Sequence, residues 1–267
     1  MEWWHIYLLI TGAFVGFFAG LLGIGGGLII VPVLITLFTA QSFPVNSISH
    51  MALGTTMATI LFTSISSLYT HYRHGAIQWN IVVPMTPGIF LGTLIGTILV
   101  SALTSNILNI IFVIFIFYAA TQMLMQFRPR AMFQFPGKIG LFIVGGLIGG
   151  ISSLVAIGGG LLSVPFLTMC KVKMQHAIGT AAAIGFPIAF AGTIGYAANG
   201  ILQPDLVLPK YSLGYIYLPA LAWLVLASTL TAPIGARMMY STKTSILRTV
   251  FVILLYSLGI RMLISLV

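Results

Sequence analysis

The sequence predicts an all-α polytopic membrane protein. Only 5% of its 267 residues are charged, and the mean hydropathy of +1.13 is far above what a soluble core needs. Apolar runs of about 20 residues, enough to cross a bilayer as a helix, recur along the whole chain. A transmembrane β-barrel would show alternating segments of about ten residues instead. These observations favour a helical bundle within a lipid bilayer.

Ten apolar segments are predicted as helices. They cover about 6–22, 28–40, 50–72, 79–101, 105–127, 139–156, 161–170, 175–198, 212–236 and 244–265. A polar stretch, MQFRPRAMFQFPGK, separates the fifth segment from the sixth. We therefore divide the chain into a first membrane repeat at 1–127, a connecting loop at 128–138 and a second membrane repeat at 139–267.

Matching segments in the two halves support the division into two repeats. GGGLIIVPVL at 25–34 matches GGGLLSVPFL at 158–167. ALGTTMATI at 52–60 matches AIGTAAAIG at 177–185. Two shorter matches follow in the same order, one of them between RHGAI and ANGIL. Several matches in one order predict an internal duplication.

The basic residues predict how the two halves are oriented. If each GGG segment crosses the membrane once, the 11 basic residues divide six against five. If each GGG segment folds back as a hairpin, nine fall on one side and only Lys210 and Arg261 on the other. The positive-inside rule favours the second arrangement. We therefore expect two inverted-topology repeats, each with a GGG broken-helix hairpin plus three transmembrane helices, a cytoplasmic connecting loop and both termini outside.

The net charge and the single cysteine exclude other classes of protein. A charge of +9 would suggest nucleic acid binding in a soluble protein, but here it reflects membrane orientation and anionic headgroups. We expect the lipid bilayer as a partner and no nucleic acid. Cys170 alone excludes an intrachain disulfide and a cysteine-based metal site. The start of the chain, MEWWHIYLLI, has no basic region and no cleavage site, so no signal peptide is expected.

The two GGG triplets carry the chemistry that the sequence suggests. Each precedes a short helix, whose first turn has free N–H donors at the positive end of the helix dipole. Such an end is a ready anion site, and glycine lets an anion approach the backbone. Two inverted hairpins would direct two of these ends at one central point. Close helix packing is the alternative, and we favour it for Gly16, Gly20, Gly145, Gly146, Gly149 and Gly150.

The substrate is expected to be an anion. Cation transporters and proton relays use intramembrane carboxylates, whereas the only two here, Glu2 and Asp205, lie outside the apolar segments. The candidate substrate-binding residues are Gly25, Gly26, Gly27, Gly158, Gly159, Gly160, Thr55, Thr56, Thr180, His50 and His176. For the two histidines, a place at an interfacial helix start remains the alternative. We expect no catalytic residue, no cofactor and no metal, since the HxxH pair His71 and His74 lacks a further ligand.

These motifs resemble the sulfite exporter TauE/SafE family of membrane permeases. The resemblance rests on GIGGG…VP and GGG…VP, on the ALGT and AIGT helix starts and on the RHGAI loop, and it covers about Ile6 to Leu266. It implies transport of small sulfur-containing anions, such as sulfite or organosulfonates. One departure is that Ala156 stands where the first copy has Gly23, which predicts a tighter second hairpin and unequal halves.

We therefore expect a secondary transporter, a permease or exporter, in the inner or plasma membrane. It would bind its anion near the bilayer midplane between two Gly-rich helix breaks. An anion channel of the same architecture and a transporter of another small anion remain alternatives. No nucleotide-binding signature occurs, nor a nucleophile and base pairing typical of an enzyme. The exact anion, the direction, the coupling ion and the oligomeric state stay open.

Overall fold

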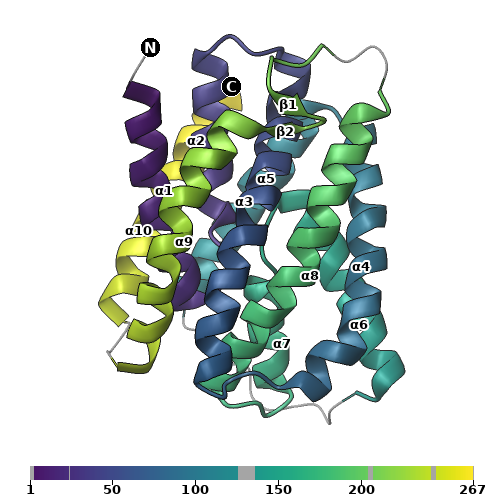
Figure 1. Ribbon diagram of the computed structural model, residues 1–267, viewed down its shortest axis with the longest axis vertical. Coiled ribbons are helices and arrows are strands. Elements are labelled where there is room, and N and C mark those ends of the chain that lie inside the picture. Colours follow the sequence, from purple (N-terminus) through teal and green to yellow (C-terminus); the bar gives the residue numbers. More distant parts are fainter. Residues whose placement is uncertain (1–2, 24, 126–135, 204–206, 242–244, 267) are drawn as a thin grey trace.

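A computed structural model describes residues 3–23, 25–125, 136–203, 207–241 and 245–266 (Figure 1). These residues form ten helices and two short strands. In chain order they are α1 (Trp3–Leu22), α2 (Gly27–Ala40), α3 (Val45–Arg73), α4 (Trp79–Ala102), α5 (Ser105–Leu124), α6 (Lys138–Val155), α7 (Gly160–Met169), α8 (Met174–Ile201), β1 (Ser212–Leu213), β2 (Ile216–Tyr217), α9 (Leu218–Ser241) and α10 (Ser245–Leu266). Within the described residues, eight helices are long and apolar enough to cross a membrane. The predicted all-α polytopic membrane class is therefore confirmed.

The predicted segments match the ten helices with one exception. Residues 212–217, which we expected to begin a membrane helix, form an antiparallel hairpin in which Ser212 pairs with Tyr217. Gly214 makes the turn with a φ of +54°, and a Cβ there would overlap the Ala197 carbonyl of α8. The turn thus packs backbone to backbone against α8, which requires glycine. The expectation of a helix over these six residues was wrong, and the last-but-one helix starts after them.

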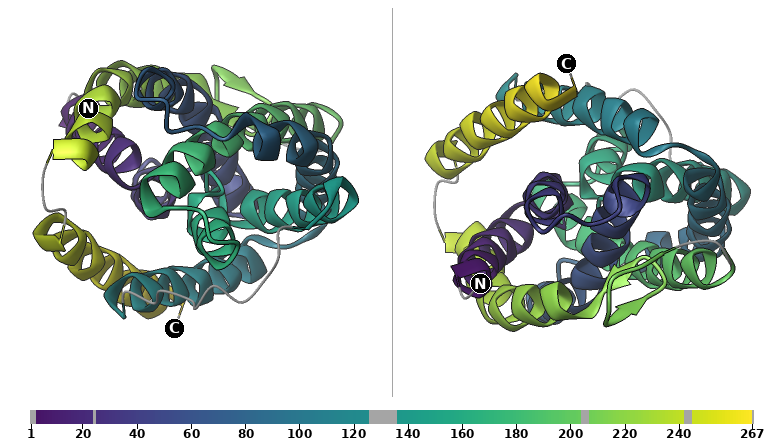
Figure 2. Two further views of the ribbon diagram at one scale, coloured as in Figure 1. Left: turned by 90° about the horizontal axis from the view of Figure 1, so that it is seen from below. Right: turned by 90° about the horizontal axis from the view of Figure 1, so that it is seen from above.

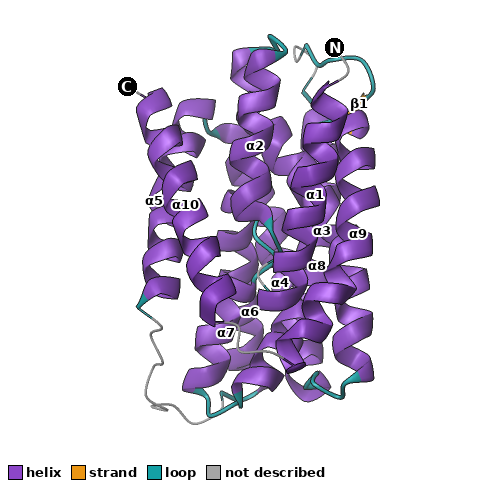
Figure 3. Ribbon diagram, turned by 90° about the vertical axis from the view of Figure 1, so that its left-hand side faces the viewer, coloured by secondary structure: helices purple, strands orange, loops and turns teal. Residues whose placement is uncertain are grey.

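Two helical hairpins enter the bundle from opposite ends. Figure 2 shows that the short helices α2 and α7 lie within a ring of longer helices. The helix α1 runs inward from the end that carries both termini, and α2 returns to that end (Figure 3). The helices α6 and α7 do the same from the opposite end, so the breaks between the paired helices lie in the middle of the bundle.

The helix contacts of the first half recur in the second. The helix α1 packs against α9, and α6 packs against α4. In the same way α3 contacts α9, and α8 contacts α4. Two further contacts join corresponding helices of the two halves, α3 with α8 and α5 with α10. Each short helix rests on the long helix that follows it, α2 on α3 and α7 on α8. The two halves thus interlock, and neither buries its apolar surface alone.

The basic residues gather at the end of the bundle opposite the termini. This end holds the last turn of α3, the first turn of α6, the turn before α8, the end of α9 and the start of α10 (Figure 1). Its described basic residues are Arg73, Lys138, Lys171, Lys173, Arg237 and Arg248. Lys210 and Arg261 lie towards the other end. Arg128, Arg130, Lys243 and most of the 128–138 loop lie outside the described residues. We call the end opposite the termini, which holds the six basic residues named first, the basic end.

Glycines bring the paired helices into close contact. In α1 and α6, the glycines whose added Cβ would press on the partner helix backbone include Gly16, Gly20, Gly145 and Gly149. A Cβ on Gly145, for example, would lie 2.5 Å from the Met85 carbonyl oxygen of α4. Gly146 and Gly150 lie at ordinary contact distance from α4. The glycines of α1 and α6 thus act as packing surfaces, as small residues do between membrane helices.

One contact between α4 and α6 gives a matched test of this packing. A Cβ at Gly92 would overlap the Gly146 carbonyl, whereas a Cβ at Gly146 would lie 3.5 Å from the Gly88 carbonyl. We expect Gly92→Ala to destabilise the protein by about 1–3 kcal/mol, as overpacking does. Gly146→Ala should leave the apparent melting temperature in detergent near that of the wild type. Equal destabilisation by the two substitutions would contradict the packing described.

Candidate functional site

The two GGG segments meet at the centre of the bundle. A Cβ on Gly25 would lie 2.8 Å from the backbone of Gly158. A Cβ on Gly27 would overlap the carbonyl oxygen of Ala156. The first helix break therefore lies directly against the second, and glycine is what allows the contact. We call this place, formed by residues 25–27 and 156–160, the crossing.

Each short helix begins at the crossing with a glycine in the left-handed conformation. Gly26, the residue before α2, has a φ of +75°, and Gly159, the residue before α7, has a φ of +77°. An L residue with a side chain would destabilise the protein by roughly 1–2 kcal/mol in this conformation. A glycine cap has no side chain to accept the first N–H groups of the helix. Both helices thus present the positive ends of their dipoles at the crossing.

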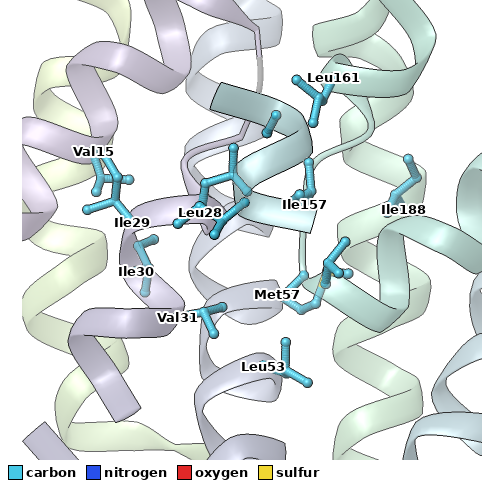
Figure 4. Packing of buried hydrophobic residues seen from close by; sticks show 14 of the residues in the cluster. Val15, Leu28, Ile29, Ile30, Val31, Leu53, Met57, Ile157, Leu161 and Ile188 are labelled. Carbon is cyan, nitrogen blue, oxygen red and sulfur yellow. The ribbon is translucent and has the colours of Figure 1, made fainter. Parts of the chain in front are cut away.

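Apolar side chains surround the crossing on most sides. Figure 4 shows Leu28 of α2 and Ile157 of the second break close together, with Met57 of α3 and Ile188 of α8 nearby. All four side chains are buried. The helix ends are therefore shielded from water, and electrostatic interactions there are stronger than at a surface.

One face of α3 carries hydroxyl groups past the crossing. Ile60 of α3 packs against Gly25 and Gly27. Thr56, four residues earlier, and Ser67, seven residues later, lie on the same side of the helix because of its period. Both hydroxyl oxygens are buried and have no hydrogen-bond partner among the described residues. We call Thr56, Thr63 and Ser67 the hydroxyl face; it offers two uncommitted donors, one on each side of the crossing.

A small cavity lies between the hydroxyl face and the crossing. It measures about 20 Å³, enough for roughly one water molecule. Its lining comes from α1, α3, α8 and both breaks: Ala19, Gly23, Gly25, Ile60, Thr63, Ser64, Ser67, Gly158, Ala182 and Gly185. Ser64 donates its proton to the Leu61 carbonyl at 2.8 Å, whereas the Ser67 hydroxyl is uncommitted. In this conformation the cavity has room for about one water molecule, which is less space than an oxyanion needs.

The helix α8 carries glycines near the crossing, where α3 carries hydroxyl groups. Gly185 lies against the Gly158 backbone, and Gly192 lies against the Met57 side chain. One turn beyond Gly192, the fully buried Tyr196 donates a hydrogen bond of 2.7 Å to the Ser153 carbonyl in the last turn of α6. The two long helices at the centre therefore differ in chemistry, and the polar side is that of α3.

His71 has a place in α3 like that of Tyr196 in α8. It is fully buried and hydrogen-bonds the backbone of Gly20, in the last turn of α1. Each long central helix thus holds the end of a broken helix with one buried polar ring. Sequence reasoning missed this pair, although His71 and Tyr196 have the same offset of 125 residues as the ALGT and AIGT motifs.

Two of the candidate threonines, Thr55 and Thr180, accept hydrogen bonds from the backbone of connecting segments. The Thr55 Oγ1 accepts the backbone N–H of Tyr217 at 2.9 Å, and the Thr180 Oγ1 accepts that of Gln78 at 3.0 Å. The glycine before each threonine lets the loop approach: a Cβ at Gly54 would lie 2.6 Å from a loop carbonyl. The ALGT and AIGT motifs therefore anchor the segments that lead into α9 and α4.

The two candidate histidines lie away from the crossing. By helix rise, His50 is about 15 Å along α3 from Ile60, and His176 is about 13 Å along α8 from Gly185. A ring nitrogen of each faces a backbone carbonyl, at 3.1 and 3.2 Å respectively. Of the eleven candidate residues, the structure brings together the six glycines, with Thr56 on the adjoining face of α3.

The comparisons with known proteins concern nearly the whole chain. A protein-family model described as Sulfite exporter TauE/SafE matches residues 8–262. A probable membrane transporter protein of Haemophilus influenzae is 36% identical over 255 residues, which cover 95% of this chain and 96% of that protein. Another of that description, from Methanocaldococcus jannaschii, is 26% identical over 96% of this chain and 94% of its own length. No solved structure matches the chain.

The second break offers a test of backbone strain. Ala156 has a φ of +48°, in the left-handed region that Gly23 occupies in the first break with +68°. Because alanine is strained there, we expect Ala156→Gly to stabilise the protein by about 1 kcal/mol. Ala119→Gly, in the buried interior of α5, should instead destabilise it by about 1 kcal/mol or more. Thermal unfolding in detergent checks both signs, and destabilisation by Ala156→Gly would contradict the strain.

The loop anchors offer a second test. Thr55→Val leaves the part-buried N–H of Tyr217 without its acceptor, which should cost about 1–3 kcal/mol of stability. Thr59→Val is the matched control, because the Thr59 hydroxyl only donates back to the Thr55 carbonyl within α3. We expect Thr59→Val to leave the melting temperature nearly unchanged. The same loss of stability in both variants would show that the loop contact is unimportant.

Proposed function

Because the chain belongs to the sulfite exporter TauE/SafE family, we propose that this membrane transporter carries small sulfur-containing anions, such as sulfite or organosulfonates. We propose that it is a secondary transporter whose anion binds at the crossing. The observation that carries the proposal is the meeting of two glycine-capped helix starts beside the hydroxyl face. The only carboxylates of the chain, Glu2 and Asp205, fall outside the described helices, so an anion meets no repulsion from acidic side chains there.

The chemistry of the crossing suits an oxyanion. The first N–H groups of α2 and α7 are donors, and the glycines leave their backbone accessible. Ser67 and Thr56 add two hydroxyl donors from α3. Hydrogen bonds to a charged group contribute about 1.5–3 kcal/mol each after the exchange with water is counted, so each donor at the crossing adds to the affinity for an anion. The arrangement is neutral, which lets a bound anion leave again.

The small volume of the cavity favours a transporter over a channel. A space for about one water molecule cannot admit an oxyanion, so the two breaks must separate before the anion enters. Left-handed glycines in both breaks are suited to absorb such a change in backbone angles. In a channel of the same architecture, a continuous path for the ion would run through the crossing during conduction. Movement of the halves around a central site is the mechanism of transporters with broken helices.

Two inverted-topology repeats, at 1–127 and 139–267, would provide the two moving parts. The matched helix contacts and the entry of the two hairpins from opposite ends support this interpretation. We propose that the basic end faces the cytoplasm, with both termini outside, in the inner or plasma membrane. In that orientation, an inside-negative potential favours exit of an anion by about 2.3 kcal/mol per charge per 100 mV.

Transport by purified protein in liposomes tests the role of the hydroxyl face. We expect Ser67→Ala to raise the KM for sulfite about tenfold, which corresponds to the loss of one hydrogen bond to an anion. Its melting temperature should stay near that of the wild type, because the hydroxyl has no hydrogen-bond partner in the part of the chain that the structure describes. Ser64→Ala is the matched control, since Ser64 already donates to the Leu61 carbonyl. An unchanged KM in Ser67→Ala would remove Ser67 from the site.

Counterflow separates the transporter from its alternatives. Liposomes loaded with unlabelled sulfite should accumulate labelled sulfite transiently, which a channel does not produce. The same liposomes should be offered sulfate, thiosulfate, sulfoacetate, taurine, phosphate and chloride as competitors. Sulfite flux without counterflow would favour a channel. Competition by phosphate or chloride alone would favour a transporter of another small anion.

A further inference from the structure

A groove lies between α3 and α9 at the basic end of the bundle, on the outside of the helix pair. Its volume is about 670 Å³. One part of it is apolar and faces outward, with Ile65 and Tyr69 of α3 exposed to 47% and 58% beside Pro233 of α9. The other part ends at two exposed guanidinium groups, those of Arg73 and Arg237. The groove thus joins a membrane-facing apolar surface to a positively charged end.

The two guanidinium groups have no counter-charge in the chain at this end. The sequence holds only two acidic residues, Glu2 and Asp205, and both lie outside the described residues. Their described neighbours, the start of α1 and the end of α8, lie at the opposite end of the bundle, about 40 Å away by the length of α3. The Arg73 guanidinium lies 5.3 Å from the centre of the Tyr69 ring, which holds it over the groove. Both charges are therefore available to an external anion.

The shape of the groove identifies the kind of anion. A free inorganic anion would use the guanidinium groups and leave the exposed Ile65 and Tyr69 uncovered. A phospholipid uses both parts, with its phosphate at Arg73 and Arg237 and an acyl chain along Ile65. Basic pockets between membrane helices on the cytoplasmic side are suited to anionic headgroups. We propose that this groove is a binding site for an anionic phospholipid, with phosphatidylglycerol as the simplest headgroup that fits.

This site is separate from the crossing. Ser66, which lines the groove, donates to the Thr229 carbonyl of α9 at 2.9 Å and so fixes the two helices at this place. Ser67, the next residue, points to the cavity at the crossing. A lipid in the groove would therefore hold α3 and α9 together without entering the anion site. The proposal does not depend on which anion is transported.

Native mass spectrometry and thermal unfolding with added lipid test the proposal. The wild type should retain phosphatidylglycerol in preference to phosphatidylcholine and should melt at a higher temperature with it. Arg73→Gln combined with Arg237→Gln should weaken phosphatidylglycerol binding about tenfold or more. The matched control is Lys210→Gln combined with Arg261→Gln, which removes the same charge at the opposite end and should bind like the wild type.

A third variant keeps the test decisive if the arginine variant is unstable. Ile65→Asn retains both guanidinium groups but removes the apolar part of the groove, so it should weaken lipid binding and leave the effect of glycerol phosphate unchanged. Equal lipid retention by the two charge variants would overturn the proposal. So would stabilisation by glycerol phosphate or inorganic phosphate as large as that by phosphatidylglycerol, because a free anion would then be the ligand.

Discussion

The structure depends on how two broken helices are tolerated inside a membrane protein. Lipid offers no hydrogen bonds to a free backbone group, so a helix break at membrane depth must be buried in protein. Here each break is covered by the other, with Gly25 against Gly158 and Gly27 against the Ala156 carbonyl. Glycine at these positions is therefore required by the packing, and the same absence of side chains leaves the first N–H groups of both short helices without a side-chain acceptor. Packing and proposed binding have one physical origin.

The other elements serve to hold this contact in place. The glycine surfaces of α1 and α6 fix the outer helix of each hairpin to α9 and α4. His71 and Tyr196 hold the inner ends of those helices, and Thr55 and Thr180 anchor the loops that lead into α9 and α4. Every one of these contacts joins residues from the two halves or from distant parts of one half. A movement of one half against the other would therefore act directly on the crossing.

The fold was predictable from the sequence to within a few residues, because apolar runs set off by glycine, proline and charge define membrane helices. The hairpin at 212–217 was missed because its Tyr, Leu and Ile residues suit a strand and a membrane helix equally. Within the site, the repeated motifs led to the glycines and to Thr56. They did not lead to Ser67, whose counterpart in the second half is Gly192, or to His71 and Tyr196, which are unlike residues in equivalent places. Nor does a motif show that Thr55 anchors a loop while its neighbour Thr56 lies on the hydroxyl face without a hydrogen-bond partner among the described residues. Successive residues of a helix differ in direction by about 100°.

The central claim is that the crossing binds a small sulfur oxyanion, and the melting temperature of the purified protein in detergent tests it most directly. Sulfite should raise the melting temperature in a saturable way, whereas acetate and chloride at the same ionic strength should not. The increase should be lost when a side chain fills the contact, as in Gly27→Ala. An increase of the same size with every anion, or none with any sulfur oxyanion at millimolar concentration, would contradict the claim.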